Sequence, residues 1–184
     1  MPFPASFAPA RQRQIERLSL LVRLLCLLAA LTLLILPPWL WSQPTWVLAM
    51  AQKDFGVSLV QLDAGARFYG LAASLLPVGV GLWALASIWR LFGCYARGDL
   101  LSLRPALHLR RLSLALITLP AALPIAQTLT VLALTLGNPP GQRTLSFLLS
   151  SQHYLSLLFG LVLLAVSTVL VEAARVADEN ASFV

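Results

Sequence analysis

Charged side chains are scarce in this 184-residue chain: Asp, Glu, Lys and Arg together make up 11% of the residues. A soluble domain carries about 25% charged residues to cover its surface, so a soluble monomer is nearly excluded. The hydrophobic share of 59% also excludes an intrinsically disordered chain, because such chains are poor in apolar residues. The composition therefore predicts a protein that is embedded in the hydrocarbon of a membrane.

Side chains that commonly carry catalysis or bind metals are also few. Cys26 and Cys94 are the two cysteines, and neither lies where an oxidising compartment would pair them, so we predict no disulfide. The two histidines, His108 and His153, fall on opposite sides of the predicted membrane and cannot share a metal or a haem within one chain. There is no phosphate-binding glycine loop, Cys-x-x-Cys pair or nucleophile elbow. We therefore predict no enzyme activity, no cofactor and no metal site.

Four long apolar runs occupy most of the chain, at about residues 18–36, 68–91, 112–136 and 154–171. A bilayer core of about 30 Å needs about 20 apolar residues in a helix. The runs are apolar on all faces, whereas strands of a membrane barrel alternate apolar and polar residues. We therefore predict an all-α membrane protein, a four-helix transmembrane bundle that forms a single membrane domain over residues 1–184.

The first of these runs is predicted to end at Pro37 and Pro38, which cannot donate backbone hydrogen bonds. It is longer than the apolar region of about 7–15 residues in a signal peptide, so we expect a membrane span and not a cleaved leader.

The distribution of positive charge predicts the orientation. Ten arginines lie in or beside one set of connecting segments, and three basic residues (Lys53, Arg67 and Arg143) lie on the other side. Loops rich in Lys and Arg stay in the cytoplasm. Segments 1–17, 92–111 and 172–184 are therefore predicted to be cytoplasmic, with both termini inside. The net charge of +6 thus indicates topology, and we predict no direct contact with nucleic acid.

Segments 37–67 and 137–153 are the predicted outer loops. The first of them is interpreted either as a short helix at the membrane surface or as a small cap that faces a ligand. Its tryptophans, Trp39, Trp41 and Trp46, are expected at the level of the lipid headgroups, and His153 at the end of the second loop is expected at the outer interface.

A few features within the runs could bring helices together. Gln127, Thr128 and Thr130 follow two prolines in the third run, and they are interpreted either as the lining of a polar crevice or as hydrogen-bonding contacts between helices. Gly70 and Ser74 form a small-x-x-x-small pair that permits close helix approach. Arg23 lies near the inner end of its run, and its long side chain can extend to the membrane surface.

Two predicted cytoplasmic segments have distinctive sequences. Residues 91–111 are consistent with a helix end, a glycine turn at Gly98 and an amphipathic entry into the next helix. Residues 171–184 extend the fourth run as a polar helix, in which Asp178 and Glu179 are placed to meet the cytoplasmic arginines. The candidate partner contacts in these two segments are Tyr95, Arg97, Gly98, Asp99, Arg110, Arg111, Glu172, Arg175, Asp178, Glu179 and Asn180.

These segments carry a family resemblance. The run from Tyr95 to Asp99, a following Leu-Arg-Arg, and the tail from Glu172 to Asn180 resemble a bacterial membrane family catalogued as domain of unknown function 2975. The resemblance covers the four-helix layout and the second to fourth runs, whereas the first run and the first outer loop offer no motif. It implies an inner-membrane protein of unknown biochemistry. Members are often encoded beside helix-turn-helix regulators, which implies a regulatory partner, and the resemblance carries over no catalytic residue.

Three functions follow from these observations. The first is a non-enzymatic accessory or regulatory protein whose cytoplasmic loop and tail bind a partner, for example a helix-turn-helix regulator. The alternative is a small transporter or channel subunit, for which the prolines of the third run and Gln127 are the motivation and in which a homo-oligomer would build the pore. A membrane enzyme ranks last, because no acid–base pair or metal-binding set converges on one side.

Overall fold

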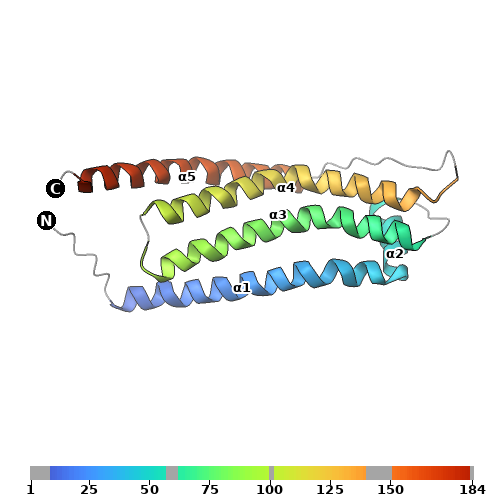
Figure 1. The fold of residues 1–184 in the computed structure, drawn as a ribbon, viewed down its shortest axis with the longest axis horizontal. Coiled ribbons are helices and arrows are strands. Elements are labelled where there is room, and N and C mark those ends of the chain that lie inside the picture. Colours follow the sequence, from blue (N-terminus) through green and yellow to red (C-terminus); the bar gives the residue numbers. More distant parts are fainter. Residues whose placement is uncertain (1–8, 57–61, 100–101, 140–150, 183–184) are drawn as a thin grey trace.

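The computed structural model describes residues 9–56, 62–99, 102–139 and 151–182, and these residues form five α-helices and no strand. The helices are α1 (Pro9–Ser42), α2 (Pro44–Phe55), α3 (Ala64–Ala96), α4 (Leu103–Thr135) and α5 (Ser151–Ser182) (Figure 1). Four of them, α1, α3, α4 and α5, are long and apolar enough to cross a membrane. The predicted all-α class with four membrane-capable helices is therefore confirmed.

The four long helices form an open row and not a closed bundle. Helix α1 packs on α3, α3 on α4, and α4 on α5, while the described parts of α1 and α5 do not approach each other (Figure 1). Within the most apolar stretch of each helix, 33% of the residues are buried in α4 but only 11% in α1 and α5. The predicted arrangement as a bundle is corrected to an open row of helices. The sequence could not predict the row, because runs that are apolar on every face do not specify which neighbours they pack against.

Helix α1 continues through Pro37 and Pro38, so the predicted helix end at these prolines is wrong. Each proline removes one donor from the helical hydrogen bonds. The turn that follows is held instead by tertiary contacts, because Trp41 is buried at 8% exposure against α3. A Cβ atom added at Gly70 of α3 would overlap the Trp41 ring. Gly70 thus makes room for the Trp41 ring, and the close approach of two helix backbones predicted from the Gly70 and Ser74 pair stays a prediction.

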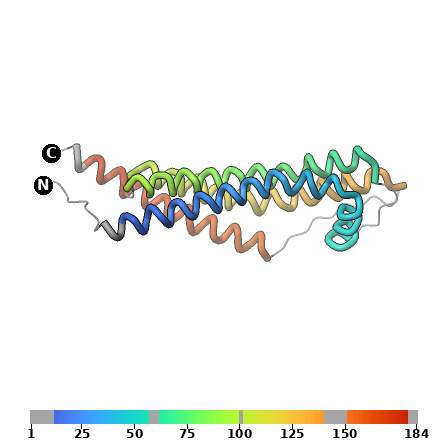
Figure 2. The backbone as a smooth tube through the Cα atoms, turned by 90° about the horizontal axis from the view of Figure 1, so that it is seen from below, coloured from blue at the N-terminus to red at the C-terminus, as the bar shows by residue number. Residues whose placement is uncertain are grey.

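A short helix, α2, follows α1 and lies across the long axis of the other helices (Figure 2). Pro44 occupies its first turn, and Gly56, in the left-handed conformation at φ 63°, ends it. Its residues Val47 and Ala51 are buried in a cluster with Trp41 and Leu134 of α4. The helical interpretation of the first outer loop is confirmed, and α2 joins the ends of α1 and α4. Trp41 belongs to this cluster, whereas Trp39 and Trp46 are 50% and 59% exposed.

The buried residues of α5 recur every seven residues along the helix, and three of the four are small. The buried residues of α5 in the described region are His153, Gly160, Ser167 and Ala174. A seven-residue repeat keeps one face of a helix on a neighbour that crosses at a shallow angle. At Gly160 the backbones are close, since an added Cβ would lie 3.0 Å from the Ile117 backbone nitrogen.

A hydrogen bond sets the register of the two helices. The Ser156 hydroxyl donates to the carbonyl oxygen of Leu116 over 3.2 Å. Leu116 lies near the middle of α4, so α5 begins beside the middle of α4. His153, one turn before Ser156, is buried at 7% exposure, and its position at the outer interface of the membrane stays a prediction. Most of the second predicted outer loop, residues 140–150, lies outside the described residues.

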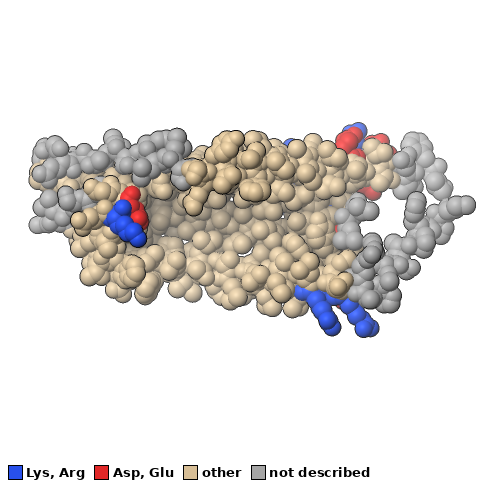
Figure 3. All heavy atoms as spheres, turned by 180° about the vertical axis from the view of Figure 1, so that it is seen from behind, with Lys and Arg blue, Asp and Glu red and all other residues tan. Residues whose placement is uncertain are grey.

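Charged side chains gather near the two ends of the molecule, with a broad uncharged band between them (Figure 3). The start of α1, the turn between α3 and α4 and the end of α5 lie at the same end, which we call the basic end (Figure 1). It carries Arg13, Arg17, Arg97, Arg104, Arg110, Arg111 and Arg175. An uncharged band between charged ends is typical of helices that place apolar side chains in hydrocarbon and charged ones at its two faces.

Candidate functional site

The turn that joins α3 to α4 at the basic end is a helix stop built around Gly98. Its backbone N–H donates to the Tyr95 carbonyl over 3.0 Å, and the N–H of Asp99 donates to the Cys94 carbonyl over 3.1 Å. This pair of bonds around a left-handed residue, here Gly98 at φ 78°, is a Schellman motif. The predicted glycine turn is confirmed. Gly98, one of the predicted partner contacts, therefore has a structural role, since it ends α3.

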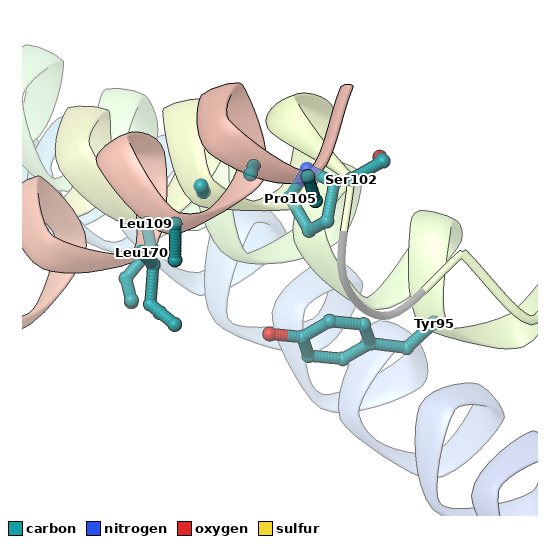
Figure 4. A pocket seen from close by; sticks show the side chains of 9 residues that line it. Tyr95, Ser102, Pro105, Leu109 and Leu170 are labelled. Carbon is teal, nitrogen blue, oxygen red and sulfur yellow. The ribbon is translucent and has the colours of Figure 1, made fainter. Parts of the chain in front are cut away.

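A cavity of about 200 Å³ lies beside this turn, between α4 and α5 (Figure 4). The Tyr95 ring lies along one side, with its hydroxyl directed toward Leu109 and Leu170. The hollow exists because three of the four α5 residues that line it are alanines. The lining residues are Tyr95 of α3; Ser102, Pro105, Ala106 and Leu109 at the start of α4; and Leu170, Ala173, Ala174 and Ala177 of α5.

The cavity brings together the two segments that the sequence singled out. Tyr95 comes from the loop motif, and Ala173 and Ala174 stand between Glu172 and Arg175 of the tail motif. Among the lining residues, Tyr95 alone was a predicted site residue. The other eight were missed, although the spacing of the tail alanines 173, 174 and 177 is a signal for a small-residue face on a helix. Ser102 adds a polar group, because its buried Oγ has no hydrogen-bond partner in the described structure.

The tail carries a row of exposed ion pairs within α5. Arg175 lies 3.1 Å from Glu172 and 3.5 Å from Glu179, and these side chains are 60–64% exposed. Exposed pairs of this kind contribute at most about 1 kcal/mol. The predicted meeting of a tail acid with a cytoplasmic arginine is confirmed for Glu179, whose partner is Arg175 of the same helix. Their charges are therefore presented to the surroundings.

The remaining predicted contacts at the basic end are exposed. Arg97, Arg110, Arg111 and Asp178 have side chains open to the surroundings, and Asp99 is half-buried. Arg97 also donates from Nη2 to the Cys94 sulfur over 3.4 Å. Asn180 lies in the last turns of α5, and its side chain is outside the described ones. The two predicted segments thus carry exposed charged side chains of both signs at the basic end, and none of these side chains lines the cavity.

The polar residues predicted within α4 lie apart from this cavity. The Thr128 hydroxyl donates to the Pro124 carbonyl over 2.9 Å, and Thr130 is buried at 6% exposure. Gln127 is half-buried, and its Oε1 has no hydrogen-bond partner in the described structure. The cavity at the basic end contains none of these three side chains. Thr128 donates to the backbone of its own helix, and the choice between a polar crevice and contacts between helices stays a prediction.

No group of three or more His, Cys, Asp and Glu residues that could hold a metal is present in the described parts of the chain. Cys26 and Cys94 are free and buried, as predicted. The basic end offers a small apolar cavity that is lined by a phenol and a hydroxyl, with exposed charged side chains elsewhere at the same end. Such a surface is suited to binding.

Comparison with known families agrees with the motifs that surround this cavity. Residues 57–184 match the family described as "Protein of unknown function (DUF2975)", and the match includes α3, α4 and α5 but neither α1 nor α2. Comparison with curated proteins and with solved structures finds no significant match. The match covers well over half of the sequence and contains every side chain that lines the cavity at the basic end. The chain therefore belongs to this family.

Proposed function

We propose that the protein is a non-enzymatic accessory or regulatory protein of a bacterial inner membrane, and that its basic end faces the cytoplasm and binds a protein partner. One observation carries the proposal: Tyr95 of the loop and three alanines of the tail line the same cavity. Loop and tail thus form one surface, although more than 70 residues separate them in the sequence. The excess of arginine at this end supports a cytoplasmic orientation.

The surface suits a partner that inserts a side chain. Buried anchors that fill pockets dominate the energy of protein interfaces, while charged residues around them set orientation and association rate. On α5, the exposed row of Glu172, Arg175 and Glu179 lies on the opposite face from the alanines that line the cavity. The family resemblance favours a helix-turn-helix regulator as the partner.

Filling the cavity is expected to abolish partner binding. Ala177→Trp places a large ring where only a methyl group now lines the cavity, and partner recovery on pull-down of the full-length protein should fall about ten-fold or more. Removal of the tail after Glu172 should have the same effect. Val176→Trp is the matched control, because Val176 is 45% exposed and does not line the cavity. Equal recovery from all four proteins would contradict the proposal.

The alternative function, a small transporter or channel subunit, is supported by Gln127, whose buried Oε1 has no hydrogen-bond partner in the described structure. We expect Gln127→Leu to leave potassium leakage from protein-containing liposomes unchanged. It should also raise the free energy of unfolding by about 1–3 kcal/mol, because an unsatisfied buried group is removed. If wild type conducts potassium and Gln127→Leu does not, the transport function would replace the accessory one.

A further inference from the structure

An apolar groove of about 390 Å³ runs along the contact between α1 and α3, apart from the cavity at the basic end. Its walls present almost no polar surface. The residues that define its length are Leu27, Ala30 and Leu34 of α1 and Leu82, Ala86 and Trp89 of α3. The alanines face the groove from opposite walls, and their small side chains keep it open.

A cation stands at one end of this groove. Arg23 lies on the same face of α1 as Leu27, Ala30 and Leu34, at helical spacings of four, seven and eleven residues. Its guanidinium carbon lies 4.3 Å from the centre of the Trp89 ring, which is also a wall of the groove. The indole therefore holds the guanidinium in place through a cation–π contact.

This cation has no anion to pair with in the described structure. The ion pairs found there are confined to α5. The Nε of Arg23 is buried and has no hydrogen-bond partner among the described residues. Charged side chains within membrane helices are rare, and they almost always pair with an opposite charge or line a functional path. An anion supplied from outside the chain would complete this site.

The length of the groove identifies what kind of molecule would bring that anion. From Arg23 to Leu34, α1 rises about 16 Å, which is close to half of the hydrocarbon core of about 30 Å. The groove itself, from Cys26 to Leu34, accounts for about 12 Å of this rise, so the groove and the cation of Arg23 together span one leaflet, with the cation toward the basic end. A lipid acyl chain has the length and the apolar character of this groove, and a phosphate accepts paired hydrogen bonds from a guanidinium.

We propose that the groove between α1 and α3 binds one acyl chain of an anionic phospholipid, with the lipid phosphate on Arg23. The lipid belongs to the leaflet at the basic end. Arg23 supplies the preference for an anionic headgroup, and the apolar walls supply affinity for the chain. This site is independent of the proposed partner surface, because it shares no residue with the cavity beside Tyr95.

Native mass spectrometry of the full-length protein tests this assignment. The protein is released from nanodiscs that contain equal amounts of phosphatidylglycerol and phosphatidylcholine with identical acyl chains, and the retained lipids are identified. Wild type should retain one phosphatidylglycerol per chain, in preference to phosphatidylcholine by about ten-fold. Arg23→Gln should lose this preference, whereas Arg13→Gln should keep it, since Arg13 is exposed nearer the start of the same helix.

A second pair of variants tests the apolar part of the site. Ala30→Phe fills the groove and should reduce retention of both lipids about ten-fold, as burial of several methylene groups is lost. Ala165→Phe adds the same ring on the exposed face of α5 and should change nothing. If Ala30→Phe lacks the helical content of wild type, Ala86→Phe is used in its place, because it fills the same groove from the α3 side.

Four results would overturn the assignment. Wild type could show no preference between the two lipids, or Arg13→Gln could lose the preference as fully as Arg23→Gln, which would indicate a general charge effect. Glycerol phosphate without acyl chains could displace the lipid, which would indicate a site for a free anion. Finally, wild type could be a dimer that Ala30→Phe converts to a lipid-free monomer, which would make the occupant a second copy of the chain.

Discussion

A single methyl group added at Gly160 is expected to destabilise the contact between α4 and α5, lowering the free energy of unfolding by about 1–3 kcal/mol. The new Cβ would lie 2.8 Å from Cγ1 of Ile117, 3.0 Å from the backbone nitrogen of Ile117 and 3.2 Å from the carbonyl carbon of Leu116. Backbone atoms cannot rotate away, and a β-branched side chain in a helix has one strongly preferred rotamer. The two helices must therefore separate. Gly160→Leu should cost more than Gly160→Ala.

Gly160→Ala is expected to lower the free energy of unfolding, although helix propensity alone would raise it. This opposition of sign provides the control. Alanine is the better helix former by about 1 kcal/mol. Gly79→Ala in α3 adds its methyl group where no atom lies within 4 Å, so it should be neutral or stabilising. Unfolding by SDS in mixed micelles, followed by circular dichroism, measures both variants. If Gly160→Ala were as stable as Gly79→Ala, the close approach of α4 and α5 would be wrong.

The same contact positions the cavity at the basic end. Gly160, Ser167 and Ala174 lie on one face of α5, and Ala174 is a wall of the cavity. A variant that separates α5 from α4 at Gly160 should therefore weaken partner recovery as well as stability. Ser156→Ala, which removes only the hydrogen bond to Leu116, should cost about 0.6–1.7 kcal/mol.

Truncation of Trp41 to alanine is expected to cost about 3 kcal/mol or more. Trp41 packs in the cluster that joins α1, α2 and α4, and its ring lies against Gly70 of α3. Its removal leaves a cavity where four helices meet. The same detergent titration measures the loss.

Trp39→Ala is the matched control for Trp41. Trp39 lies two residues earlier in the same helix and is 50% exposed, so its truncation should cost less than about 1 kcal/mol. Gly70→Ala should lower the free energy of unfolding by part of the amount expected for Trp41→Ala, because the new methyl group on α3 displaces the Trp41 ring. Equal losses from the two tryptophan variants would show that Trp41 is not a tertiary contact.

Part of the candidate site could be predicted from sequence. Gly98 stands at a helix end and is flanked by polar residues, and the local chemistry of such an end requires a residue that tolerates the left-handed conformation. The cavity beside it could not be predicted, since Pro105, Leu109 and Leu170 are ordinary apolar residues until α4 and α5 pack together. Trp41 shows the same limit: its two neighbouring tryptophans have the same chemistry, yet only Trp41 meets a glycine on another helix.

The length and apolar character of four helices were determined by the sequence alone, because the transfer of side chains from water to hydrocarbon depends on composition and not on neighbours. The passage of α1 through two prolines, the open order α1–α3–α4–α5 and the pairing of Arg23 with Trp89 were decided by tertiary structure. For helices that are apolar on every face, the hydrophobic free energy in lipid is the same whichever helix lies next to them. The choice depends on where a small residue leaves room for the neighbouring helix: Gly160 lets two backbones approach, and Gly70 accepts the Trp41 ring.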